Sequence, residues 1–275
     1  MSEPRSPERL RHHFEVEKEL ATRMRSSTRE GRTELFKTLY TELFERVPDH
    51  PRLTRRETAE DSARNTENQL RLIRPHLGKT STLLEIAPGD CRLSYAASSL
   101  CQRVIGVDIS DQTDRSEASP DNFELIVYDG YELDLPDASV DIAFSYQFLE
   151  HLHPDDVDPH FALISRLLKP GGVYILDTPH RYSGPHDISS VFGDTLQCFH
   201  FQEWTYREMR KHLKKHGFSH TWIYRGGRVR TNPLINLAND LTELFVGLLP
   251  SGLRKKLSSR LFQSVTLLAQ KTILS

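Results

Sequence analysis

Hydrophobic positions along the chain change their spacing near residue 82. Before that point, apolar residues recur at helical intervals in two stretches, 35–47 and about 65–77. Pro48 ends the first stretch, and the polar sequence DHPRLTRRET after it predicts a loop. Residues 1–32 are charged throughout, so we expect a frayed or partly helical arm. The pattern predicts an N-terminal arm and helical lid over residues 1–64.

Short apolar runs alternate with amphipathic stretches from Thr82 onward. Helices are expected near 93–100 and 155–168, whereas 111–122 lacks apolar periodicity and is predicted to be a loop. Strands alternating with helices at this spacing are typical of a parallel sheet with helices on both faces. The five runs that predict strands are LLEIA (83–87), RVIGVDI (103–109), FELIVYD (123–129), VDIAFSY (140–146) and VYILDT (173–178).

The C-terminal part continues with a predicted helix at 204–216, a strand at 218–225 and a closing strand at 263–270. Between these strands lies a helical insertion, 233–260, that contains Pro250 and a basic turn at 254–256. We expect its apolar stripe to be core or a lid, with peripheral membrane contact or a partner helix through 234–256 as the alternative. The stripe consists of Leu234, Leu237, Leu241, Leu244, Phe245 and Leu248.

Composition excludes several classes of protein. The three cysteines, Cys91, Cys101 and Cys198, form no CxxC pair, so we expect neither a disulfide framework nor a metal site. The formal charge of −2 and the lack of a basic stripe give no support to a nucleic-acid partner. The charged N-terminus has no apolar signal segment, and no apolar run approaches the roughly 18 residues that span a bilayer. A cytoplasmic location is therefore expected.

An acidic residue marks each of the first two predicted strands. Glu85 precedes the turn around Gly89, and Asp108 closes the next strand 23 residues after Glu85. A turn without bulky side chains lets a ligand approach the backbone, and an acid about 20 residues later can accept hydrogen bonds from ribose hydroxyls. Ala87 and Cys91 stand where glycines are usual, so the G-x-G-x-x-G motif is absent. An NAD-dependent oxidoreductase is thus only an alternative.

The ordered set of segments is more specific than any one of them. LLEIAPGDC, VIGVDIS, YDGYELDLPDASVDIAFSYQFLEHLHPDD and LLKPGGVYILDTPHR resemble, in order and spacing, the motifs of class I S-adenosylmethionine (SAM)-dependent methyltransferases. The small-molecule type that includes ubiquinone and menaquinone biosynthesis enzymes is the most similar. The N-terminal LFKTLYTELFERVPDHP and the phrase TPHRYSGPHDIS resemble an uncharacterised bacterial subset. The resemblance covers about 80–225.

This resemblance implies an α/β fold: a Rossmann-like seven-stranded, mostly parallel sheet with an antiparallel last strand, inside a SAM-binding domain over 65–275. It also implies residue roles. Glu85 and the backbone near Ala87 and Gly89 would face the methionine part of SAM. Asp108 would hold both ribose hydroxyls, and Ile109 would lie against the adenine.

The same resemblance assigns the rest of the cofactor site. Asp129 would accept a hydrogen bond from the adenine amine, with Gly130 and Tyr131 lining that pocket. Ser145 to Gln147 would form the floor beneath the sulfonium. All of these positions follow strands, and open α/β sheets bind ligands at the carboxyl ends of their strands.

The acceptor side is expected to contain histidines. His180 and His186 lie with Arg181 and Asp187 in the loop after the fifth strand, and His151 follows the fourth. A histidine suits a general base for a hydroxyl acceptor, whereas a carbon or nitrogen acceptor can do without one. The alternatives are solvated loop histidines and a packing role for His151.

We therefore expect in-line transfer of the SAM methyl group to a small-molecule acceptor, with the helix at 35–47 closing over the site. The alternative from another class is a non-catalytic protein of the same fold that acts as a regulatory or partner subunit.

Overall fold

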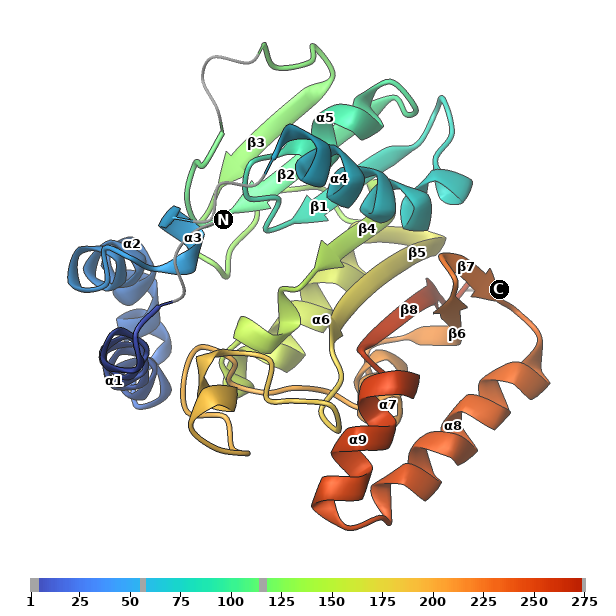
Figure 1. Ribbon diagram of the computed structural model, residues 1–275. Helices are drawn as coiled ribbons and strands as arrows, with labels where there is room; N and C mark the ends of the chain where they lie inside the picture. Colours follow the sequence, from blue (N-terminus) through green and yellow to red (C-terminus); the bar gives the residue numbers. More distant parts are fainter. Residues whose placement is uncertain (1–4, 55–57, 114–117, 274–275) are drawn as a thin grey trace.

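The computed structural model describes residues 5–54, 58–113 and 118–273 (Figure 1). Its centre is a sheet of eight strands in the order β3-β2-β1-β4-β5-β8-β6-β7. The strands are β1 (Thr82–Ile86), β2 (Arg103–Asp108), β3 (Phe123–Val127), β4 (Val140–Tyr146), β5 (Leu168–Pro179), β6 (Phe218–Arg225), β7 (Arg228–Arg230) and β8 (Ser264–Lys271).

Helices surround this sheet. The α-helices are α1 (Pro7–Arg25), α2 (Arg29–Arg46), α3 (Pro51–Thr54), α4 (Ala59–Ile73), α5 (Arg92–Ser98), α6 (Val157–Leu167), α7 (Tyr206–Lys215), α8 (Pro233–Gly247) and α9 (Ser251–Leu261). Short 3-10 helices are η1 (Arg74–His76), η2 (Leu149–His151), η3 (Pro154–Asp156) and η4 (Ile188–Val191). None of the helices in the described ranges is long and apolar enough to cross a membrane.

The sheet confirms the expected α/β architecture with one strand more than predicted. β1 to β5 pair in parallel, and β8 inserts antiparallel between β5 and β6. The additional strand, β7, forms a hairpin with β6. Gly226 and Gly227 have φ of +60° and +71°, the left-handed conformation that tight hairpins require. β7 is only three residues long and largely polar, so no hydrophobic pattern in the sequence predicts this strand.

Two apolar layers cover the faces of the sheet. On one face, α4 and α5 pack through residues such as Ile73 and Leu93. On the other, α6 and α7 pack through residues such as Phe161 and Leu213. The central strands are buried on both faces, which explains why they are continuous apolar runs in the sequence.

Residues 5–32 are partly helical, which was one of the two expected alternatives, but they are packed against the protein and are not a frayed arm. Ser6 caps α1, its Oγ accepting a hydrogen bond from the Arg9 amide at 3.3 Å. Val16, Leu20 and Met24 repeat every four residues and are buried in a third apolar cluster, which α2 and the segment around residue 199 complete. Charged residues separate these apolar positions, so their helical spacing is not apparent from the sequence. Figure 1 shows α1 and α2 side by side at one end of the sheet.

Helix α8 also contradicts its prediction, because the apolar stripe faces away from the domain. The six stripe residues are between 49% and 78% exposed. The buried face is mostly polar instead, with Val246 as its one buried apolar residue. Asn236 accepts a hydrogen bond from the Ile223 amide at 3.1 Å, and Arg225 donates to Asn239 at 2.8 Å. Glu243 accepts bonds from backbone amides at the start of α7. Specific hydrogen bonds, not burial of leucines, attach α8 to the protein.

Candidate functional site

A cavity of about 620 Å³ lies at the carboxyl ends of β1, β2 and β4. This volume is in the range of small-molecule sites, and the location is where open α/β sheets bind ligands. Side chains of α1 and α2 form its opposite wall, including Phe36 and Tyr40. Phe36 packs so closely on Gly130 that a Cβ at residue 130 would lie 2.9 Å from its ring. The N-terminal helices therefore cover the site.

The turn between β1 and α5 has the backbone conformation of a glycine-rich loop, although it contains few glycines. Ala87 and Cys91 have φ of +53° and +62°, and Gly89 has +57°. The left-handed region costs a residue with a Cβ about 1–2 kcal/mol. The Cys91 side chain is fully buried, and burial raises the pKa of its thiol to about 12, which favours a packing role over that of a nucleophile. The two substitutions thus preserve the conformation that the usual glycines would provide.

Asp108 joins this turn to the end of β2. Its Oδ2 accepts a hydrogen bond from the Gly89 amide at 3.3 Å, and its Oδ1 accepts one from the Ser110 amide at 3.2 Å. The side chain lines the cavity and is 6% exposed. Burial raises the pKa of this carboxyl above its usual value, against the opposing effect of the backbone bonds. A buried carboxylate at this point is suited to accept hydrogen bonds from the hydroxyls of a ligand.

Glu85 lies one layer deeper. Ser94 donates a hydrogen bond to its Oε2 at 2.6 Å, and burial raises the pKa of the carboxyl to about 8. Ala87, Gly89, Asp108 and Ile109 line the cavity, whereas Glu85 is not among its lining residues in the described chain. Its contact with the cofactor remains a prediction.

Of the residues predicted to lie beside the adenine, some line the cavity and one does not. Gly130 and Tyr131 line the cavity. Asp129 is exposed and does not line it in the described chain; its Oδ1 accepts hydrogen bonds from the amides of Tyr131 and Glu132, both at 2.8 Å. Asp129 therefore stabilises the turn that presents Tyr131, and its bond to the adenine amine stays a prediction.

A buried ionic latch, which sequence reasoning missed, fixes Tyr131 and α2 together. Arg32 of α2 donates to Asp156 Oδ1 at 2.7 Å and to the Tyr131 hydroxyl at 2.9 Å. That hydroxyl in turn donates to Asp156 Oδ2 at 3.0 Å. The side chains of Arg32 and Asp156 are only 4% and 8% exposed. We call these three residues the Arg32–Tyr131–Asp156 latch; it links the covering helices to the sheet domain.

Two residues at the end of β4 were predicted to lie beneath the sulfonium, and only one of them lines the cavity. Ser145 is fully buried, with its Oγ 2.7 Å from the Tyr174 hydroxyl, and does not line the cavity in the described chain. Gln147 does line it and has φ of +51°. The backbone amide of Gln147 donates to the Asp177 carbonyl at 2.8 Å, and its side chain donates to Asp177 Oδ1 at 2.7 Å. Backbone strain of this kind tends to occur at functional sites.

Two of the three predicted catalytic histidines are not at the cavity. His180 is fully buried, with Nε2 2.8 Å from Glu243 Oε1 and its ring stacked on Phe262. His186 faces Glu203 at 3.2 Å, outside the lining of the cavity in the described chain. Within the described chain, neither imidazole lines this cavity, so their place beside the acceptor stays a prediction without support from its geometry. Where the chain leaves β5, His180 forms an isolated β-bridge with Trp204.

His151 does line the cavity, and so does His200, which the sequence did not single out. His151 Nδ1 donates to the Phe199 carbonyl at 3.0 Å, and His200 Nδ1 is 3.0 Å from Glu203 Oε1. Burial lowers the pKa of His151 to about 4. Burial opposes charge on His200, but the bond to Glu203 and the nearby charges of Glu150 and Asp187 together outweigh it and raise the pKa of that imidazole.

The segment 187–203, which we call the strap, connects this acceptor side to α1. The Phe199 amide donates to Glu17 Oε1 at 3.2 Å, and Arg25 donates to the His200 carbonyl at 3.3 Å. The rings of Phe14 and Phe192 also lie 4.5 Å apart. These contacts are remote in sequence, which is why no local pattern revealed His200 as a cavity residue.

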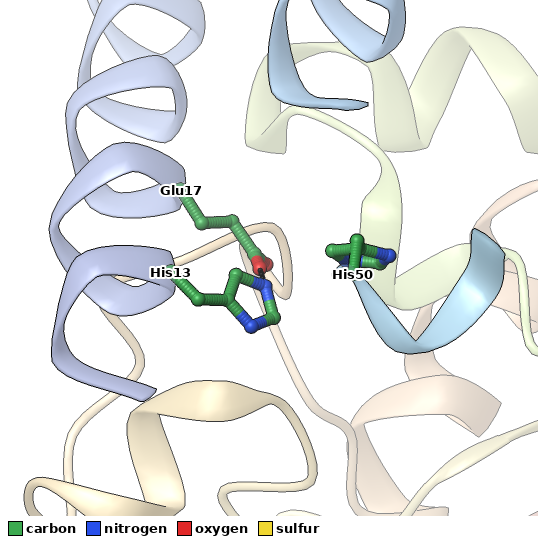
Figure 2. A group of neighbouring side chains, drawn as sticks. All are labelled: His13, Glu17 and His50. Carbon is green, nitrogen blue, oxygen red and sulfur yellow. Dashed lines mark hydrogen bonds and ion pairs between the residues drawn. The ribbon is translucent and has the colours of Figure 1, made fainter. Parts of the chain in front are cut away.

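A second polar group on the cavity wall belongs to the covering helices. Figure 2 shows the Glu17 carboxylate pointing at the His13 ring, with His50 across from both. His13 Nε2 lies 2.7 Å from Glu17 Oε2, and Arg5 donates to His13 Nδ1 at 2.8 Å. Both nitrogens of the His13 ring are thus in use, beside a guanidinium.

The sequence is similar to known methyltransferases over part of its length. Residues 84–176 match the family model described as a methyltransferase domain. A probable S-adenosylmethionine-dependent methyltransferase from Mycolicibacterium smegmatis is 30% identical over 138 residues, which are 49% of this chain. The chain spans about half the length of this curated relative, 51%.

Solved structures share the fold at low identity. Phosphoethanolamine N-methyltransferase 1 of Haemonchus contortus, in complex with phosphoethanolamine and S-adenosylhomocysteine, aligns with a TM-score of 0.58 and 14% identity, over 90% of this chain and 50% of that one. A SAM-dependent methyltransferase from Archaeoglobus fulgidus aligns with a TM-score of 0.53 and 18% identity, over 77% of this chain and 96% of that one.

Proposed function

We propose that the chain binds SAM in the 620 Å³ cavity and transfers its methyl group to a small-molecule acceptor, because residues 84–176 match the model of a methyltransferase domain and the cavity lies beside them. The observation that carries this proposal is Asp108. A buried carboxylate at the end of β2, bonded to the turn after β1, is the group that a ribose needs at this position.

The turn after β1 fits the rest of the cofactor. A Cβ built on Gly89 would meet nothing within 4 Å, so the backbone is open to a ligand there. Ile109 and Tyr131 would lie against the adenine, and Gln147 would lie near the sulfonium. Glu85 lies close behind the turn, and its carboxyl group, once deprotonated, would balance the positive charge of the methionine amine. Bound SAM supplies an electrophilic methyl group on a good leaving group.

The protein's contribution is alignment and exclusion of water. Alignment of two reactants removes much of the entropic barrier to a bimolecular reaction. Phe36 and Tyr40 of α2 wall the cavity on the side away from the sheet, and the Arg32–Tyr131–Asp156 latch holds that helix in place. The covering helices would therefore keep the acceptor beside the methyl group and away from solvent.

The acceptor would be a small molecule with an apolar part and a polar methyl-accepting group. Phe199 and Phe201 offer apolar surface, and His151 and His200 offer imidazoles. Each imidazole is held through Nδ1, which leaves Nε2 for another partner. A hydroxyl acceptor could pass its proton to such a nitrogen, because a neutral imidazole is a proton acceptor.

The test is calorimetric titration of SAM into the protein, followed by transfer of labelled methyl from SAM to a small-molecule extract. Asp108→Ala should weaken SAM binding by about 1.5–3 kcal/mol, the value of charge-assisted hydrogen bonds. Asp134→Ala is the matched control, since Asp134 is exposed and does not line the cavity in the described chain. Equal affinity in all three proteins contradicts the site. Binding without methyl transfer favours a regulatory role.

A further inference from the structure

Three side chains converge beside the cavity, and two of them, His151 and His200, line it. Glu150, His151 and His200 each offer one carboxylate oxygen or ring nitrogen, and the three atoms lie within 4.8 Å of one another. Glu150 and His151 belong to η2, after β4, and His200 comes from the strap. Two imidazoles and one carboxylate are a common ligand set for divalent transition metals.

The carboxylate has an atom without a partner. Glu150 is 1% exposed, its Oε2 accepts a hydrogen bond from Thr178 at 2.9 Å, and its Oε1 has no hydrogen-bond partner among the described residues. A buried polar atom without a partner costs about 1–3 kcal/mol and calls for an explanation. A bound cation beside Oε1 would provide one.

The imidazoles are oriented as metal ligands usually are. A ligating histidine generally donates its other ring N–H to a carbonyl or carboxylate, which fixes the ring and its tautomer. His151 Nδ1 has the Phe199 carbonyl at 3.0 Å, and His200 Nδ1 has Glu203 Oε1 at 3.0 Å. Both partners are of the kind expected around a metal, and because both bonds use Nδ1, Nε2 is the ligand atom proposed for each ring.

The neighbouring group of His13, Glu17 and His50 is a useful contrast, because it too has its ligand atoms within 4.8 Å (Figure 2). There, His13 is bonded through both nitrogens, one of them to Arg5, so a cation would have to displace these bonds beside a guanidinium. This arrangement is a closed hydrogen-bond network.

We propose that Glu150, His151 and His200 bind a divalent transition-metal ion, with Zn²⁺ or Fe²⁺ as the chemical class, at the wall of the acceptor cavity. His151 and His200 line the cavity, so the remaining coordination positions face it. If the proposed methyl transfer holds, an oxygen of the acceptor would complete the coordination sphere. The ion would then replace the imidazole base: coordination lowers the pKa of a bound hydroxyl, its proton would pass to water, and the oxygen would attack the methyl group of SAM while the sulfur leaves with the bonding electrons. The substrate class is then a hydroxyl-bearing acceptor.

The experiment uses the full chain stripped of metal with a chelator and titrated with Zn²⁺ by calorimetry and with Co²⁺ by visible absorption. One equivalent should bind, and millimolar Mg²⁺ should not compete, because it prefers oxygen ligands. Glu150→Gln, which keeps the shape and the bond from Thr178, and His200→Ala should each weaken Zn²⁺ binding by at least about 10–100-fold, the loss that even an outer partner of a metal ligand causes.

His50→Ala is the matched control, since His50 lines the same cavity from the other group, and it should change Zn²⁺ affinity less than about 2-fold. Circular dichroism confirms that each variant is folded. The proposal is overturned if the folded wild type binds neither Zn²⁺ nor Co²⁺ stoichiometrically. It is also overturned if His50→Ala abolishes binding while Glu150→Gln and His200→Ala retain it. Titration of SAM into the same samples separates the two ideas: metal binding without SAM binding contradicts only the proposed function.

Discussion

Removing Asp156 tests whether the Arg32–Tyr131–Asp156 latch holds the covering helices on the sheet domain. In Asp156→Ala, the guanidinium of Arg32 loses its counterion at a position where its side chain is only 4% exposed. Breaking a buried ion pair by removing one partner costs about 3–5 kcal/mol, because the other charge is left uncompensated. The Tyr131 hydroxyl also loses its acceptor.

Urea unfolding followed by circular dichroism measures the effect. With a urea m value on the order of 3 kcal/mol/M for a chain of this size, the midpoint should fall by about 1–1.7 M. The double variant Arg32→Met/Asp156→Ala should recover at least half of this loss, because it removes both charges. Hydrogen exchange should show that α2 opens more readily in Asp156→Ala than in the wild type.

The control is Asp137→Ala, which breaks an ion pair with Arg166 at 2.6 Å. Asp137 is 74% exposed, so its pair should contribute no more than about 1 kcal/mol. If Asp156→Ala costs no more than Asp137→Ala, or if the double variant is no more stable than Asp156→Ala, the latch does not work as described.

Three further predictions concern the site itself. Because burial raises the folded-state pKa of Glu85 to about 8, the ligand-free protein should lose stability as pH rises from about 4.5 to 8, and urea midpoints of Glu85→Gln should lack this part of the pH dependence. His151→Ala should slow turnover on a hydroxyl acceptor by about 10²–10⁴-fold. Since the pKa of His151 is about 4, protonation of this imidazole should not change the wild-type rate between pH 5 and 8. A fall in rate at pH 6 that disappears in His151→Ala would contradict the assignment of His151 as a base that is neutral over this range. Ala87→Gly should change stability by less than about 1 kcal/mol and preserve SAM affinity, because glycine adopts φ of +53° without strain while its unfolded chain gains entropy; loss of SAM binding on titration would show that the Cβ matters.

Local sequence determines the strands and their ends, and these parts of the fold were predictable. Asp108, Gly130 and Gln147 reach the cavity because each follows a parallel strand whose apolar run is visible in the sequence. His200 and Arg32 were not predictable, since their positions depend on contacts between segments far apart in the chain.

The outward face of α8 was missed for a different reason. Hydrophobic spacing identified the helix but not the side that docks, because that side is selected by hydrogen bonds from Asn236, Asn239 and Glu243. His180 shows the same effect: its sequence position beside the fifth strand predicted a cavity residue, and the Glu243 carboxylate holds it elsewhere.

The strap also has a kinetic consequence. It carries His200 and is bonded to α1 through Glu17 and Arg25, while α2 is bonded to the sheet domain through Arg32. We expect a ligand to leave the cavity by opening some of these bonds, and opening of α1 would then release the strap with it. Exchange of cofactor and product should then share one opening step, with a rate set by that step and not by diffusion. Saturation of the observed binding rate at high SAM concentration in stopped-flow measurements would be its signature.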